Sequence, residues 1–166
     1  MDKTWLVLGV LNTTLVTLVA SFAIIPLLLA KQLEYDNRDL QYTTTKAWRF
    51  KAREGSWLQE KVLKKMRVAG LASGNFIVIR PGLSEDRETS VIKHEEAHVI
   101  QFYAYGPLQP VIYGGHWLYI AITATDFSKH AYYDNIFERQ ARKWAGQQVD
   151  IPREEWGNPD NRFFWW

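Results

Sequence analysis

Five consecutive residues, His94-Glu95-Glu96-Ala97-His98, constrain this chain most, because they read H-E-x-x-H inside a run with the composition of a helix. Positions four apart lie on one face of an α-helix, so both imidazoles can reach a single metal ion. Zinc accepts neutral imidazole ligands, and a catalytic zinc site keeps one position open for water. Glu95 follows the first histidine and is placed to take a proton from that water.

The predicted metal helix covers Thr89–Tyr105, with Thr89 or Ser90 at its start. Gly106-Pro107 should end it, because proline resists continuation of a helix. The alternative is a solvated helical face that carries two histidines by chance. Against this alternative, the flanks on the same side are apolar: Val91, Ile92, Val99 and Phe102.

A catalytic zinc site needs a third protein ligand, and two histidines with one glutamate form a known set. Glu138 is the best candidate, on a second helix predicted to begin at Asp134 or Asn135 and to end at Gly146. The alternative for Glu138 is a capping box with Asn135. His116 and His130 are reserve ligands, although a lone histidine in an apolar run, such as His116, is more often a hydrogen-bonded core residue.

Composition excludes several kinds of site. The chain of 166 residues has no cysteine, so a disulfide framework, a cysteine zinc site and a thiol nucleophile are all ruled out. A net charge of +2 gives no basic stripe, and nucleic acid is therefore not an expected partner. Eight tryptophans and 14 % aromatic residues suit contact with a membrane interface.

The run Trp5–Ala30 contains 26 residues without a charge, long enough to cross a bilayer as a tilted helix. A cleaved signal peptide is the alternative, but its apolar core is shorter, about 7–15 residues. We therefore predict a single-pass anchor over residues 1–30. Lys31, Arg38, Lys46 and Arg49 follow the run, and the positive-inside rule places the C-terminal part in the cytoplasm.

The predicted organisation continues with a juxtamembrane connector over residues 31–55, with a short strand over residues 41–45, and one domain over residues 56–166. Within the domain, Ser56 and Gln59 form a capping box for a helix that runs to about Val68. The apolar run Phe76–Ile79 predicts a strand, either in the core or at the edge of a substrate cleft. Trp117–Thr125 predicts a helix in the core or on the membrane.

Two motifs together resemble the glutamate-liganded branch of the zinc metallopeptidases, the gluzincins. His94-Glu95-x-x-His98 is followed downstream by Asn135-x-x-Glu138-x-x-Ala141. The likeness is closest to small metallopeptidase domains that carry a strand with a Pro-Gly turn, then H-E-x-x-H-x-x-Q, here ending at Gln101, and then N-P-F-E-x-x-A. The resemblance covers roughly residues 76–146.

This resemblance implies that His94, His98 and Glu138 bind zinc and that Glu95 is the general base. Related membrane-anchored enzymes carry an aspartate that orients the first histidine, and this chain departs from that pattern because Arg142 stands at the position, which puts this support of the histidine in doubt. Thirty-nine residues separate His98 from Glu138, and this insert must fold back.

The sequence thus predicts a membrane-anchored zinc metallopeptidase that hydrolyses peptide or protein substrates. Tyr132, Tyr133 or His130 would stabilise the oxyanion. The expected fold is α+β and mainly helical, with a small sheet beside the H-E-x-x-H helix. One alternative is a catalytically silent scaffold or binding module of the same fold on a membrane. The other is an integral membrane component whose two histidines are buried in the core.

Overall fold

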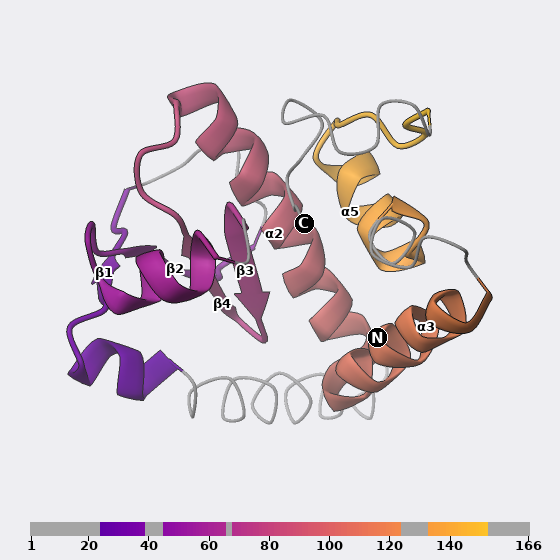
Figure 1. Ribbon diagram of the computed structural model, residues 1–166, viewed down its shortest axis with the longest axis horizontal. Coiled ribbons are helices and arrows are strands. Elements are labelled where there is room, and N and C mark those ends of the chain that lie inside the picture. The colour runs from indigo at the N-terminus through magenta and orange to yellow at the C-terminus, as the bar shows by residue number, and fades with distance from the viewer. Residues whose placement is uncertain (1–23, 39–44, 66–67, 124–132, 153–166) are drawn as a thin grey trace, which may run out of the picture.

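Figure 1 shows a small sheet beside one long helix in the computed structural model, which describes residues 24–38, 45–65, 68–123 and 133–152. The sheet has the strand order β1-β2-β4-β3, in which β2 and β4 are parallel and the other neighbours antiparallel. Its strands are β1 (Leu33–Tyr35), β2 (Trp48–Ala52), β3 (Gly70–Ser73) and β4 (Phe76–Ile79). The expected mixed α+β class is confirmed.

The helical elements labelled within the described residues are the π-helix η1 (Leu58–Leu63), α2 (Glu85–Tyr105), the 3₁₀ turn η2 (Gly106–Leu108), α3 (Gln109–Thr123) and α5 (Ile136–Trp144). Residues 24–29 are also helical. Two segments of the predicted connector over residues 31–55 are strands of the sheet, namely β1 and β2.

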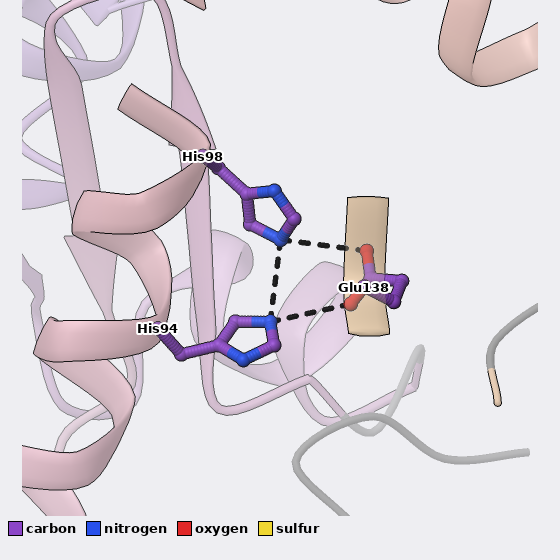
Figure 2. Close-up of side chains that lie close together, drawn as sticks. All are labelled: His94, His98 and Glu138. Carbon is purple, nitrogen blue, oxygen red and sulfur yellow. Dashed lines mark hydrogen bonds and ion pairs between the residues drawn. The ribbon is translucent and has the colours of Figure 1, made fainter. Parts of the chain in front are cut away.

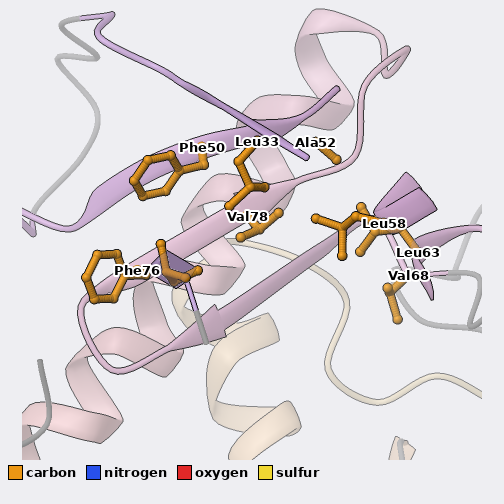
Figure 3. Close-up of a cluster of buried hydrophobic side chains, with 9 residues drawn as sticks. Leu33, Phe50, Ala52, Leu58, Leu63, Val68, Phe76 and Val78 are labelled. Carbon is orange, nitrogen blue, oxygen red and sulfur yellow. The ribbon is translucent and has the colours of Figure 1, made fainter. Parts of the chain in front are cut away.

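Strand β4 lies at the centre of the sheet, and all four of its side chains are buried. Alternate residues of a strand point to opposite faces. Phe76 and Val78 join the apolar cluster drawn in Figure 3, together with residues of β1, β2 and η1. Ile77 and Ile79 join a second cluster with Val91, Ile92 and Val99 of α2, among others. The predicted strand is confirmed, and its cleft-edge alternative is wrong, because β3 occupies that edge.

Helix α2 begins four residues earlier than expected. Its N-cap position is Ser84, and the first turn carries Glu85, Asp86 and Glu88. Acidic residues favour the first turn of a helix because they complement its dipole, so a segment that reads as a charged loop is the start of the helix. The helix ends as predicted at Gly106, whose φ of 57° suits glycine.

Two other helices differ from expectation. The helix after Ser56 is a short π-helix that ends at Leu63. The Ser56 hydroxyl accepts a hydrogen bond from the Gln59 N–H, but the Gln59 side chain accepts from Gly55 N, so half of the capping box forms. Helix α3 begins at Gln109, well before Trp117, because a proline such as Pro110 fits the first turn of a helix.

The predicted membrane anchor lies mostly outside the described residues, which begin at residue 24. None of the helices within the described ranges combines the length and apolarity that crossing a membrane requires. The predicted strand over residues 41–45 and the aromatic C-terminal tail also fall mainly or wholly outside those ranges.

Candidate metal centre

Helices α2 and α5 bring three side chains from distant parts of the chain together. His94 and His98 lie one turn apart on α2, and Glu138 lies in the first turn of α5 (Figure 2). Each offers one ligand atom, and the three atoms lie within 4.8 Å of one another. The two Nε2 atoms are 3.2 Å apart, and the Glu138 carboxylate lies 3.2 Å from His94 Nε2 and 3.4 Å from His98 Nε2. All three side chains are buried.

The N-cap of α5 is formed by Asn135, and Glu138 takes no part in it. The Asn135 side chain caps α5 by accepting a hydrogen bond from Phe137 N. The Glu138 carboxylate instead lies between the two histidines and the Tyr113 hydroxyl. The close packing of α5 on α2 is helped by Ala141, which is fully buried one turn after Glu138.

Two glutamines orient the histidine rings. Gln101 Nε2 donates to the carbonyl of Phe137, so its amide oxygen faces His98 Nδ1 at 2.8 Å. Gln147 Nε2 donates to the carbonyl of Ser90, so its oxygen faces His94 Nδ1 at 3.2 Å. An amide oxygen can only accept, and each Nδ1 must therefore carry the proton. In the neutral rings both Nε2 lone pairs then point to the same space, as metal ligands require.

Gln147 therefore orients His94, the role that an aspartate at the position of Arg142 fills in the enzymes that this chain resembles. Arg142 is itself buried, and its guanidinium contacts Tyr133. Its guanidinium lies 5.7 Å from the centre of the Tyr133 ring and donates to the Tyr133 carbonyl.

Glu95 lies beside the three candidate metal ligands, and its side chain packs closely against Gly70. Its side chain is buried, and its Oε1 has no hydrogen-bond partner among the described residues. A Cβ atom on Gly70, the first residue of β3, would lie 2.8 Å from that same oxygen. The absence of a side chain at position 70 is therefore what makes room for the Glu95 carboxylate.

Burial and the charges of neighbouring groups shift the pKa values of four residues in the centre: His94, Glu95, His98 and Glu138. Burial raises the pKa of Glu95 to about 8. Burial lowers the pKa of His94. For His98, burial acts downward, but the Glu138 carboxylate outweighs it and raises the pKa to about 9. Burial also opposes ionisation of Glu138, yet the two histidines hold the pKa of its carboxyl well below the usual range. The centre thus favours an ionised carboxylate beside positive charge.

A cavity of about 260 Å³ opens next to this group. Three of its lining residues come from the candidate centre, namely Glu95, His98 and Glu138. The edge strand β3 and the helices α2 and α3 supply the others: Leu71, Ala72, Phe102, Gln109, Pro110 and Tyr113. The Tyr113 hydroxyl donates to Glu138 Oε1 at 2.9 Å. Tyr113 is a residue that the sequence reading missed, because it lies in an apolar stretch without a motif.

The other predicted site residues lie elsewhere. Tyr133 is buried against Arg142 and is not one of the cavity-lining residues. Tyr132 and His130 fall outside the described residues. His116 lies on α3 with its ring 6.2 Å from that of Tyr119, and it does not join the metal-ligand group found among the described residues.

Comparisons of the chain with protein-family models, with curated proteins and with solved structures found no match. The resemblance to the gluzincins therefore stays a prediction from the motifs.

Proposed function

We propose that this protein is a membrane-anchored zinc metallopeptidase. The observation that carries the proposal is the buried convergence of His94, His98 and Glu138, with the Glu95 carboxylate beside them at an open cavity. The sequence spacing predicts this set, and the fold supplies it from two helices that pack together.

The residues present fit a zinc ion in three respects. Two imidazole nitrogens and one carboxylate are ligands that zinc takes in catalytic sites. Both rings present Nε2, because Gln101 and Gln147 accept from Nδ1. Within the described ranges the buried oxygen Oε1 of Glu95 has no hydrogen-bond partner, which is costly unless a ligand or water supplies one. His94, His98 and Glu138 would hold the ion.

A bound zinc ion would polarise the scissile carbonyl and lower the pKa of water from about 15.7 to roughly 7. Glu95 acts as the general base, taking a proton from the attacking water on its carboxylate and returning it to the amine nitrogen that leaves. Its confinement against Gly70 fixes the carboxylate for both transfers.

Tyr113 is the donor that we assign to the oxyanion. Tyr113 lines the cavity, and its single hydroxyl proton, donated to Glu138 in this structure, would turn to the charge that develops on the substrate oxygen. This assignment replaces the earlier candidates Tyr132, Tyr133 and His130, of which Tyr133 alone is described and lies against Arg142. Leu71 and Ala72 of the edge strand β3 line the same cavity, where an extended substrate could pair with free backbone groups.

The anchor in this proposal is the uncharged run Trp5–Ala30, which is long enough to span a bilayer. The basic residues that follow it favour a catalytic domain in the cytoplasm.

The proposal is tested by replacing Glu95 with glutamine in the zinc-loaded full-length chain in detergent. Hydrolysis of a quenched fluorescent peptide library should fall by about 10²-fold or more while zinc content stays the same. The matched control is Glu96→Gln, since the neighbouring Glu96 accepts from Thr45 and lies outside the cavity. Full activity in Glu95→Gln would refute the mechanism. A parent that binds zinc but cleaves nothing would favour a silent scaffold.

A further inference from the structure

Helix α3 has the polarity of its faces reversed relative to an ordinary surface helix. Gln109, Tyr113, His116 and Ile120 recur at helical spacing, and they are its buried or partly buried residues. Two of these four inward residues, Gln109 and His116, are polar, and Tyr113 directs its hydroxyl to Glu138. The exposed surface instead carries large apolar side chains, at positions Val111, Ile112, Trp117, Leu118, Tyr119 and Ile122. We call these six residues the outer face of α3.

Water is a poor environment for this outer face. Ile122 is 77 % exposed and Val111 is 68 % exposed, and α3 contains no aspartate, glutamate, lysine or arginine. Soluble surface helices place charged and polar residues outward and apolar residues inward. A contiguous exposed apolar patch marks a site of contact with a partner or with lipid.

The position of α3 in the molecule favours lipid. Figure 1 shows α3 and the helical residues 24–29 along the same lower edge. Ile25 and Leu29 of that short helix are also exposed. The uncharged run that begins at Trp5 leads directly into it, so the chain enters the described fold at the edge that α3 occupies. Helix α3 and the described end of the uncharged run, residues 24–29, therefore lie toward the same edge in this view.

Length and composition indicate how α3 would lie. Its 15 residues extend about 22 Å, which is less than the roughly 30 Å of a bilayer's hydrocarbon core. Trp117 and Tyr119 are residue types that concentrate at the membrane interface. A short helix with an apolar outer face and aromatic residues suits a position parallel to the membrane plane.

We propose that α3 lies flat in the interface of a lipid bilayer, with its outer face in contact with acyl chains. Gln109 and Tyr113 of the inward face, together with Pro110, line the cavity of the candidate site. The cavity therefore opens beside the membrane surface. For substrates, and resting on the proposed peptidase function, this favours polypeptide segments that lie close to the bilayer.

The chain offers a direct test because it contains no cysteine. Single variants Leu118→Cys and Ile122→Cys of the full-length protein are spin-labelled and reconstituted into vesicles of phosphatidylcholine and phosphatidylglycerol. Asp86→Cys, an exposed position at the start of α2 on the opposite edge, is the matched aqueous control. Accessibility to oxygen and to a water-soluble nickel chelate is measured at each label.

We expect the ratio of oxygen accessibility to nickel-chelate accessibility to be severalfold higher for the labels at 118 and 122 than for the label at 86. Nickel access at 118 and 122 equal to that at 86 would place α3 in water and overturn the proposal. Exclusion of both reagents would mean that protein covers the face. A strong spin–spin interaction would then identify a second copy, and its absence would point to another segment of this chain. None of these readings depends on zinc or on peptidase activity.

Discussion

The amide oxygen of Gln147 lies 3.2 Å from Nδ1 of His94, the first histidine of the H-E-x-x-H motif. Gln147 follows Gly146, whose φ of 70° turns the chain back toward α2 after α5 ends. Its amide nitrogen is held by Ser90, through both the carbonyl and the hydroxyl. The ring of His94 is thus fixed from outside the motif by a residue 53 positions away.

Gln147→Leu should weaken zinc binding by about 10- to 100-fold, because the Nδ1 proton of His94 loses its acceptor and the ring loses its orientation. Competition with a chromophoric chelator measures the affinity. Gln148→Leu is the control, since that neighbouring side chain donates to the Asp150 carbonyl instead. Equal affinities in the two variants would rule out an orienting role for Gln147.

Gly70→Ala should reduce peptidase activity by about 10²-fold with zinc retained. A Cβ at this position would lie 2.7 Å from the Val91 side chain and 2.8 Å from Glu95 Oε1, so the base must move. Displacement of a catalytic group by about 1 Å can cost this much. The control is Gly115→Ala, where an added Cβ meets nothing within 4 Å. Steady-state kinetics and zinc analysis of the two variants measure the effect. An unchanged kcat in Gly70→Ala would contradict the confinement of Glu95.

Tyr113→Phe should lower kcat by about 10²-fold, the usual cost of losing one donor to an oxyanion. Zinc content should change little, because the phenol touches the ligand Glu138 but is not itself a ligand. Tyr35→Phe, an exposed tyrosine on β1, serves as the control. An unchanged kcat in Tyr113→Phe, or a loss confined to zinc content, would leave Tyr113 without a catalytic role.

The ion pair between Asp36 and Arg38 should make stability fall at acid pH. The Arg38 guanidinium lowers the pKa of the Asp36 carboxyl, outweighing its burial. A carboxyl with a depressed pKa in the folded state stabilises the protein above its unfolded pKa of about 3.8, and this contribution is lost as pH falls through the folded pKa. Thermal midpoints at pH 6 and below pH 3 should differ less in Asp36→Asn than in the parent. An identical pH dependence would contradict this contribution.

The residues closest to the motif could be read from the sequence, and the more distant ones could not. The i, i+4 spacing is sufficient to place His94 and His98 on one face of α2. The Asn135-x-x-Glu138 pattern is sufficient to begin a helix. By contrast, the contacts of Tyr113 and Gln147 depend on how α3 and the chain after α5 return to α2, which no local periodicity encodes.

In the sheet, too, one strand could be predicted from the local sequence and another could not. β4 is predictable because four apolar residues in a row suit a strand buried on both faces. β3 contains Gly70 and Ser73 and has no such pattern, although it forms the edge beside the cavity. Its pairing with β4 and the space that Gly70 leaves for Glu95 become visible only in three dimensions.

The proposed peptidase function depends most on the three-ligand centre, and the zinc content of the full-length chain tests that centre directly. Parent, His94→Ala, Glu138→Ala and the exposed control Glu85→Ala would be purified in detergent, dialysed against metal-free buffer and analysed by mass spectrometry, with circular dichroism as the folding check. We predict one zinc per chain in the parent and in Glu85→Ala, and loss of zinc in the other two. A folded parent without zinc, or zinc retained in Glu138→Ala, would contradict the proposed centre.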